Sequence, residues 1–289
     1  MGLTGLHESA PAKVNLCLYV GQTREDGRHE LVSIFQPIAL TDDVELEPGG
    51  LGSAMDRVTC PGVEGENLAT VALRRFRERT GWDGGPVRIR IDKRIPIAAG
   101  MAGGSADAGA ALRLVARASG IEDDALLREI AGGLGADVAA QVRPRRYLAT
   151  GAGERLTPLP PPAPYGVLVL PSHLGLSTAD VYREFDRQGL QRDAADLAAR
   201  LREVSTAAAD LPDELIGNDL EPAARALCPE IDEALATARE VGAHHALVCG
   251  SGPTVIGLFA DLQGARGAAA RLSERKPRPV AVAPWGAML

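Results

Sequence analysis

The chain has 289 residues, 45% hydrophobic and 24% charged, which is typical of a folded globular protein with one large or two ordinary domains. Its net charge of −7 argues against non-specific nucleic-acid binding, and its four widely spaced cysteines form neither a zinc motif nor a disulfide framework. No apolar run approaches the roughly 18 residues of a membrane span, and the N-terminus lacks a signal-peptide pattern. We expect a cytoplasmic protein that binds neither nucleic acid nor a membrane.

The first half of the chain mixes strand and helix patterns. Residues 1–9 have no periodic pattern, so we expect a loose tail. Apolar residues then alternate with polar ones or form short apolar runs, which predicts strands over 12–21, 29–40, 42–48 and 86–96. Apolar residues at helical spacing predict helices over 66–81, 105–120 and 123–135.

The second half begins with an extended connector, because residues 157–166 (TPLPPPAPYG) contain five prolines. We place a domain boundary here, between an N-terminal domain over 1–156 and a C-terminal domain over 165–289. Beyond it we expect a strand over 166–171, helices over 177–186, 190–210, 221–242 (one or two) and 261–275, a strand–turn–strand over 245–260, and a last strand over 279–286. Strands and helices do not alternate regularly, which favours the α+β class.

The stretch RIPIAAGMAGGSADAG (94–109) contains four glycines, three of them directly before the helix predicted over 105–120. It lacks the lysine of a Walker P-loop, and its glycines have the wrong spacing for a dinucleotide fingerprint. Glycines let the backbone approach a polyanion, and the N-terminus of the following helix favours negative charge at the same point. Taken alone, the stretch fits a phosphate cradle and an ordinary helix start after a flexible turn equally well.

Seven short motifs occur along the chain, and one of them overlaps this stretch. In chain order they are PAKVNL (11–16), DGRHEL (26–31), IPIAAGMAGGSADAGAAL (95–112), GLGADVA (133–139), GAGERLTPL (151–159), GNDLEP (217–222) and GSGPTVIGLF (250–259). Their order resembles the GHMP kinase superfamily, and PAKVNL with DGRHEL resembles the branch whose acceptor is cytidine diphosphate-linked methylerythritol, in non-mevalonate isoprenoid biosynthesis. The resemblance runs from about residue 10 to the C-terminal AML. It implies two α+β domains with the active site in the interdomain cleft, ATP and Mg²⁺ as cofactors, and a small-molecule substrate.

The resemblance implies two catalytic residues. Asp137 matches the family's base, which accepts the proton of the acceptor hydroxyl, although an aspartate after Gly-Ala is usually a turn residue. Lys13 matches the family's lysine, which would orient Asp137, lower its pKa and stabilise charge on the reacting oxygens. An exposed strand lysine is the plainer alternative. Asn15 lies two residues further along the same strand face and would bind substrate.

The resemblance also implies an ATP site. Its loop residues are Pro96, Ile97, Ala98, Ala99, Gly100, Met101, Ala102, Gly103, Gly104, Ser105 and Ala106. Asn67 and Lys93 match family residues near the adenine. The metal ligands stay unknown, and so does the choice between a monomer and a homodimer.

On the acceptor side, His29 matches the residue that binds the cytosine, because an imidazole can hydrogen-bond a base edge. Tyr182 matches an aromatic that stacks on it, with Thr178 nearby, although a core tyrosine at helical spacing is the usual case. The third glycine motif, Gly250, Ser251 and Gly252, would close over the acceptor or brace the phosphate loop, and is also consistent with a tight hairpin. Asn218 and Asp219 fit a structural or substrate-side turn.

Three positions depart from the family pattern. Arg28 stands where a tyrosine usually stacks on the cytosine, and a guanidinium can also stack on a base. Ala102 replaces a preferred glycine and Ala106 a usual serine. We expect transfer of the ATP γ-phosphoryl group to the 2-hydroxyl of the cytidine-linked acceptor. The alternatives are another GHMP kinase acting on a small alcohol such as homoserine or a mevalonate derivative, and a non-catalytic nucleotide-binding protein of the same fold.

Overall fold

The computed structural model describes residues 5–50, 53–63, 65–207 and 211–286, and its mixed helices and strands confirm the α+β class. The chain forms two compact units. The first contains residues 1–12, 40–97 and 102–144, and the second contains 13–39, 98–101 and 145–289. Strands β1 (Leu6–Thr23) and β2 (His29–Pro48) contribute to both units. The division into sequence-continuous domains at the proline-rich connector stays a prediction.

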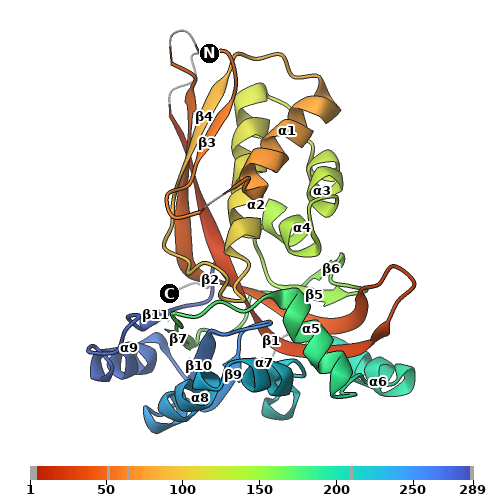
Figure 1. The fold of residues 1–289 in the computed structure, drawn as a ribbon, viewed down its shortest axis with the longest axis vertical. Helices are drawn as coiled ribbons and strands as arrows, with labels where there is room; N and C mark the ends of the chain where they lie inside the picture. The colour runs from red at the N-terminus through yellow and green to blue at the C-terminus, as the bar shows by residue number, and fades with distance from the viewer. Residues whose placement is uncertain (1–4, 51–52, 64, 208–210, 287–289) are drawn as a thin grey trace. The chain divides into compact units, whose positions relative to one another are not determined.

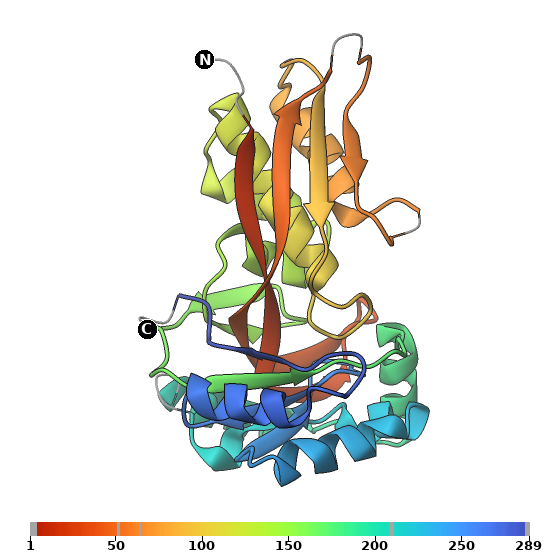
Figure 2. The same ribbon diagram turned by 90° about the vertical axis from the view of Figure 1, so that its left-hand side faces the viewer.

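In the first unit a small sheet is covered on one face by helices. Strand β4 (Val87–Asp92) pairs antiparallel with the end of β2 and parallel with β3 (Arg57–Thr59). Buried apolar and exposed polar residues alternate along β4, so only one face of the sheet needs a cover. The helices lie on one side of the sheet (Figures 1 and 2), and in Figure 1 α1 (Leu68–Thr80) and α2 (Gly103–Ser119) lie nearer to the strands than α3 (Asp124–Gly132) and α4 (Ala136–Val142).

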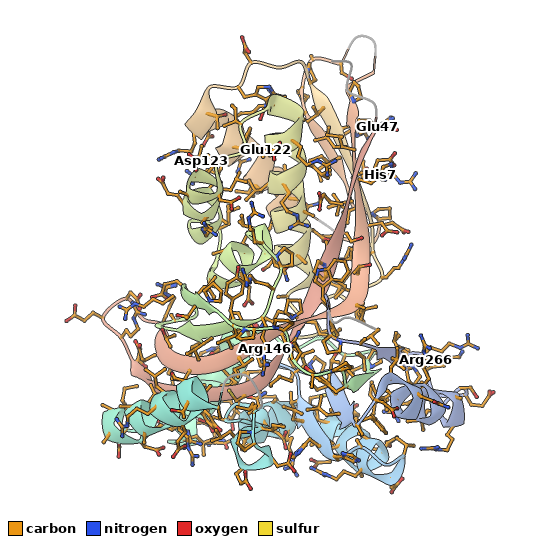
Figure 3. All side chains as sticks on the ribbon, turned by 180° about the vertical axis from the view of Figure 1, so that it is seen from behind. His7, Glu47, Glu122, Asp123, Arg146 and Arg266 are labelled. Atoms are coloured by element: carbon orange, nitrogen blue, oxygen red, sulfur yellow. The ribbon has the colours of Figure 1, made fainter. Side chains whose placement is uncertain are left out.

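The ends of these helices follow ordinary capping chemistry. The Asn67 side chain caps α1 and the Asp123 side chain caps α3, where each accepts hydrogen bonds from backbone N–H groups of the first turn (Figure 3 labels Asp123). Gly81 and Gly120 end α1 and α2 in the left-handed conformation. Helices α2 and α4 are exceptions at their starts, because Ala102 and Gly135 occupy the cap positions and make no side-chain hydrogen bond.

The second unit holds a four-stranded antiparallel sheet in the order β11 (Val280–Val282), β7 (Gly166–Leu170), β10 (Val255–Phe259) and β9 (His245–Val248). Every residue of β7 and β10 is buried, which explains their unbroken apolar sequences. Helices α8 (Glu230–Glu240) and α9 (Leu262–Arg271) pack against this sheet (Figure 1).

Shorter elements complete the second unit. Strand β1 pairs in parallel with β8 (Gly217–Asn218), and β2 pairs with the first strand of a hairpin formed by β5 (Tyr147–Thr150) and β6 (Arg155–Pro158). The remaining helices are α5 (Thr178–Arg187), α6 (Ala194–Thr206), α7 (Glu221–Leu227) and the 3₁₀ turn η1 (Asp213–Leu215). Within the described residues no helix combines the length and apolar character needed to cross a bilayer.

Several expectations need correction. Residues 6–9 belong to β1 and not to a loose tail, and 29–48 form one strand where two were expected. The two ends of β2 pair with different partners, β5 and β4, so no break is needed between them. The expectation of one or two helices over 221–242 needs no correction, because Pro229 follows the end of α7 and the range contains two helices. The expected helix over 190–210 begins at Ala194 and ends at Thr206, and residues 208–210 lie outside the described part, as does the C-terminal AML.

Candidate active site

The glycine-rich loop between β4 and α2 is anchored at its centre. Residues 98–101 group with the second unit, where Lys13 N donates to Met101 O at 3.1 Å. Gly100 has a φ of +75°, and a Cβ built on it would lie 2.0 Å from the carbonyl oxygen of Cys249. Only glycine fits such a contact in this conformation. The third glycine motif therefore lies directly against the loop, and a Cβ on Gly250 would lie 2.8 Å from Gly100 O.

The flanking loop residues differ in exposure. Ala99 and Met101 are buried, whereas Ile97 is 55% exposed and Pro96 is half-buried. Ala98 is exposed and has a φ of +52°. The loop thus buries alternate side chains around Gly100 and leaves its outer edge accessible.

The start of α2 offers a ligand mainly backbone N–H groups. Ala102 has a φ of +54° and provides no side-chain cap. A Cβ on Gly103 would lie 3.0 Å from Ile95 and 3.2 Å from the Lys93 ammonium, so this glycine is needed for close packing. A Cβ on Gly104 would meet nothing within 4 Å. Uncapped N–H groups, the positive end of the helix dipole and an open approach are what an anion requires.

The next two residues of α2 have different environments. Ser105 is half-buried in the first turn of the helix. Ala106 is fully buried, and its N–H donates to Ala102 O. A serine at 106 would have its hydroxyl in a packed environment, so the family's usual second hydroxyl has no open position here.

Lys93, expected near the adenine, forms a buried ionic cluster in the first unit. Its ammonium contacts Asp42 at 2.5 Å and Asp107 at 2.8 Å, and its side chain is 11% exposed. Burial lowers the pKa of Lys93, but the two carboxylates outweigh that effect and leave it raised. Burial raises the pKa of Asp107 to about 7 against the opposing effect of Lys93. Asp107 Oδ1 has no partner within the described residues.

Two further predicted residues lie at the starts of helices in the first unit. Asn67 Oδ1 accepts from Thr70 N at 2.9 Å and from Thr70 Oγ1 at 3.1 Å, which caps α1. Asp137 is half-buried in the first turn of α4, where a helix dipole favours a carboxylate. Lys13 belongs to the second unit, so the pairing of Lys13 with Asp137 stays a prediction.

Lys13 and Asn15 lie together on one face of β1, as their spacing predicts. The Lys13 ammonium donates to Asn15 Oδ1 at 2.9 Å, and Asn15 Nδ2 donates to Ser33 Oγ at 2.7 Å. Ser33 in turn donates to Cys17 O at 2.6 Å, and the ammonium lies 4.6 Å from the centre of the Phe35 ring. Both Lys13 and Asn15 are buried. The lysine is therefore not an exposed strand residue but a fixed, desolvated cation.

The Gly250 turn is held from two sides. Asn218 Nδ2 donates to Val248 O at 2.8 Å and to Gly250 O at 2.7 Å. The Ser251 hydroxyl lies 3.0 Å from that of Thr178, which brings together two predicted substrate-side residues from α5 and the turn. Asp219 forms a bidentate pair with Arg192. Asn218 and Asp219 thus act as structural residues of the turn region.

The predicted base-binding residues also lie together. The ring centres of His29 and Tyr182 are 5.0 Å apart, and the ring centre of Phe185 lies 5.9 Å from that of His29. His29 Nε2 lies 2.7 Å from Asp186 Oδ1. The neighbouring Arg28 is half-exposed and pairs with Asp26, whose pKa its hydrogen bonds hold below the usual range.

Sequence reasoning missed four residues that complete these groups: Asp42, Asp107, Ser33 and Asp186. Only Asp186 had a readable signal, because it follows Tyr182 by four residues and Thr178 by eight on one helix face. The other three partners depend on strand pairing and helix packing over long sequence separations.

Comparison with known proteins identifies related chains. Residues 67–144 match the model of the GHMP kinases N terminal domain, and residues 194–278 match that of the GHMP kinases C terminal domain. The chain is 41% identical to the 4-diphosphocytidyl-2-C-methyl-D-erythritol kinase of Pelotomaculum thermopropionicum over 91% of this chain and 92% of that one. It is also 41% identical to the kinase of the same name from Nocardioides sp., with the same shares covered.

Solved structures agree with these relatives. A crystal structure of a 4-(cytidine 5′-diphospho)-2C-methyl-D-erythritol kinase has a TM-score of 0.82 and 35% identity, and covers 97% of this chain and 100% of its own. A homoserine kinase from Cytophaga hutchinsonii has a TM-score of 0.73 at 17% identity over 98% of this chain and 96% of its own, and shares the fold alone. The chain therefore belongs to the GHMP kinase superfamily and, within it, to the 4-diphosphocytidyl-2-C-methyl-D-erythritol kinase family.

Proposed function

We propose that this chain is an ATP-dependent kinase that phosphorylates the 2-hydroxyl of 4-diphosphocytidyl-2-C-methyl-D-erythritol in the non-mevalonate isoprenoid pathway. Relatives of that name share 41% identity over 91% of the chain. The observation in the structure that carries the acceptor assignment is the pair formed by His29 and Tyr182, with ring centres 5.0 Å apart. An imidazole beside an aromatic ring suits a flat heterocycle that must be both stacked and hydrogen-bonded.

In the proposed reaction the acceptor oxygen forms a bond to the γ-phosphorus, and the bond from that phosphorus to the bridging oxygen of ADP breaks. Asp137 accepts the proton that the hydroxyl loses. Lys13 stabilises negative charge near the reacting oxygens, and its burial supports this role because a desolvated cation is not screened by water. The Lys13–Asn15–Ser33 hydrogen bonds fix the position of that cation.

The triphosphate is proposed to bind at the start of α2. The uncapped N–H groups there and the open face of Gly104 support this placement. The amide N–H₂ of Asn67 is proposed to contact the nucleotide, because within the described part of the chain only its oxygen is used, in capping α1. Lys93 is proposed to act indirectly at the same helix start, where its ammonium lies beside Gly103 and donates a hydrogen bond to Asp107.

Magnesium is a further part of the proposal. The described residues contain no cluster of three metal-binding side chains. Mg²⁺ often binds through phosphate oxygens with only one or two protein ligands, so the proposed site does not require a dedicated cluster of protein ligands. Ser105 is the hydroxyl at the start of α2 that could contribute one. The ion would supply charge neutralisation on the phosphates.

The acceptor is proposed to bind through residues of the second unit. His29 and Tyr182 hold the cytosine, and Thr178 with Ser251 offers hydroxyls to the remainder of the molecule. Arg28 is tied to Asp26 only by an exposed ion pair, which is weak enough to be exchanged for contact with a base or a phosphate.

The experiment is an ADP-release assay at fixed Mg-ATP with 4-diphosphocytidyl-2-C-methyl-D-erythritol, homoserine, mevalonate and phosphomevalonate as separate acceptors. We expect turnover with the cytidine compound alone. Turnover with another alcohol would assign a different acceptor, and ATP binding without turnover on any acceptor would favour a non-catalytic protein.

Asp137→Asn tests the base. We expect a loss of at least about 100-fold in kcat, the usual range for a general base, with ATP affinity within about threefold of the wild type. Asp123→Asn is the matched control, because asparagine caps helix α3 as well as aspartate does. Wild-type turnover by Asp137→Asn would exclude this residue as the base.

A further inference from the structure

We propose that Asp186 makes the acceptor site select cytosine over uracil by fixing the protonation pattern of His29. This inference rests on the proposed cytidine acceptor and adds to it a positioning residue that does not touch the base. Asp186 lies near the C-terminal end of α5 and contacts the imidazole at 2.7 Å.

The atoms around His29 Nε2 decide where its proton lies. Asp186 Oδ1 is 2.7 Å from Nε2, and Thr23 Oγ1 is 3.2 Å from the same nitrogen. An ionised carboxylate can only accept a hydrogen bond, so Nε2 must carry a hydrogen and donate it. Gln191 Nε2 donates to the same Asp186 oxygen at 2.5 Å, which holds the carboxylate in place.

Nδ1, the other ring nitrogen of His29, is then the atom that distinguishes the two bases. A neutral imidazole with its hydrogen on Nε2 has a bare Nδ1 that accepts a hydrogen bond. Across the described residues no protein group forms a hydrogen bond with Nδ1. Cytosine offers an exocyclic amine donor at position 4, whereas uracil offers an oxygen acceptor there. A bare Nδ1 therefore bonds cytosine and faces the uracil oxygen lone pair to lone pair.

The burial of His29 increases the energetic cost of a mismatched contact with uracil. The His29 side chain is only 6% exposed, so water cannot easily satisfy a mismatched pair. Helix α5 supplies the rest of the arrangement, because Tyr182 and Asp186 are one turn apart and share a face with Thr178. The stacking ring, the positioning carboxylate and a substrate-side hydroxyl are thus presented by one rigid element.

The test compares CMP and UMP as competitors of the cytidine acceptor in the ADP-release assay. We expect the wild type to bind CMP at least about 10-fold more tightly than UMP, from one hydrogen bond exchanged for an unsatisfied contact. In Asp186→Asn the amide can donate to Nε2 and move the hydrogen to Nδ1. We expect the CMP preference to fall to about threefold or less, with the acceptor KM raised and kcat at saturation retained. Asp186→Glu should restore much of the preference.

Asp180→Asn is the matched control, because Asp180 lies on the same helix, is half-exposed and pairs with Arg183. It should keep the wild-type preference. A second readout needs no variant: ¹⁵N NMR of the wild type should show a protonated Nε2 and a bare Nδ1 on His29. The opposite pattern, or an unchanged CMP preference in Asp186→Asn, would overturn the role of Asp186. A wild type that binds neither nucleotide would instead count against the proposed cytidine acceptor.

Discussion

At the scale of single residues, two glycines of the proposed phosphate loop differ in what constrains them. Gly100 is fixed by its φ of +75° and by contact with Cys249, which are internal constraints. Gly104 has neither constraint, since a Cβ there meets nothing within 4 Å and the residue lies inside helix α2. Glycine in a helix interior costs about 0.5–1 kcal/mol relative to alanine, and this is an upper bound for Gly104, the second residue of α2. We infer that glycine is present at position 104 because a ligand approaches the backbone there.

Gly104→Ala should therefore separate stability from ATP binding. We expect the free energy of unfolding to rise by at most about 0.5–1 kcal/mol while ATP affinity falls by about 10-fold or more. Gly267→Ala is the matched control, because Gly267 lies in helix α9 with open space around it. Because it is internal to its helix, Gly267→Ala should stabilise at least as much as Gly104→Ala and leave ATP affinity unchanged. Urea denaturation and calorimetric ATP titration measure the two quantities, and unaltered ATP affinity in Gly104→Ala would remove this position from the site.

Ala102 carries backbone strain that the family's usual glycine would not. Its φ of +54° is in the left-handed region, which costs a non-glycine residue about 1–2 kcal/mol. Ala102→Gly should raise the free energy of unfolding by up to about 1 kcal/mol, since the gain is partly offset by the entropy of a freer unfolded chain. Ala99→Gly is the control, because Ala99 has no positive φ and is buried, so it should destabilise. If urea denaturation showed that Ala102→Gly lowers the free energy of unfolding as much as Ala99→Gly does, that result would contradict strain at Ala102.

At the scale of elements, Asn67 has two separable functions at the start of α1. Its oxygen caps the helix, and its amide N–H₂ is proposed to contact the nucleotide. Asn67→Asp should keep the cap and change the free energy of unfolding by less than about 0.5 kcal/mol, whereas Asn67→Ala should cost about 1 kcal/mol. Asn67→Asp should nevertheless raise the KM for ATP, because it removes the donor. Steady-state kinetics beside thermal melts test this, and an unchanged KM would leave Asn67 with capping alone.

Local patterns predicted those elements whose signal is contained in their own sequence. The alternation in 86–96 located β4, and period-two spacing placed Lys13 and Asn15 on one face of β1. Strand β2 was predicted as two strands, because Pro37 and the polar residues after Leu40 resemble a break in a local window. The β5–β6 hairpin was missed, since its strands have four residues each and form through pairing of β5 with β2 and of β6 with β5.

The candidate site shows the same division. Residues within one motif, such as Gly100 to Ser105, could be grouped as a candidate site from sequence, and their binding of ATP stays a prediction. Partners that arrive from distant segments could not, because no local signal links Lys93 to Asp42 or His29 to Asp186. Those partners are fixed by packing, and they determine the charge and protonation of the residues that the motifs supply.

At the scale of the molecule, the Lys93 cluster joins three segments of the first unit. Asp42 on β2 accepts from the Lys93 ammonium and from the backbone N–H of Ile95, and Asp107 brings in helix α2. Such a buried cluster contributes little net stability when charges must be desolvated. Its effect should appear instead as a dependence of global stability on pH.

The sign of that dependence follows from Asp107. Burial raises its pKa to about 7, whereas an unfolded aspartate titrates near about 4. Between these values the folded chain holds a proton that the unfolded chain has lost, so the free energy of unfolding falls as pH rises. The stabilising contribution is complete below about pH 4 and is lost once the pH passes about 7.

Asp107→Asn should remove this decline, because an amide cannot titrate. Relative to the wild type, the variant should become more stable as pH rises from about 5 to about 8, measured by urea denaturation at each pH. Asp83→Asn, at an exposed position outside the cluster, controls for the loss of one carboxylate. If the wild type instead gained stability over Asp107→Asn with rising pH, the attraction of Lys93 would outweigh burial. Asp107 would then be an ionised carboxylate in the folded chain, and it would position the Lys93 ammonium beside the start of α2.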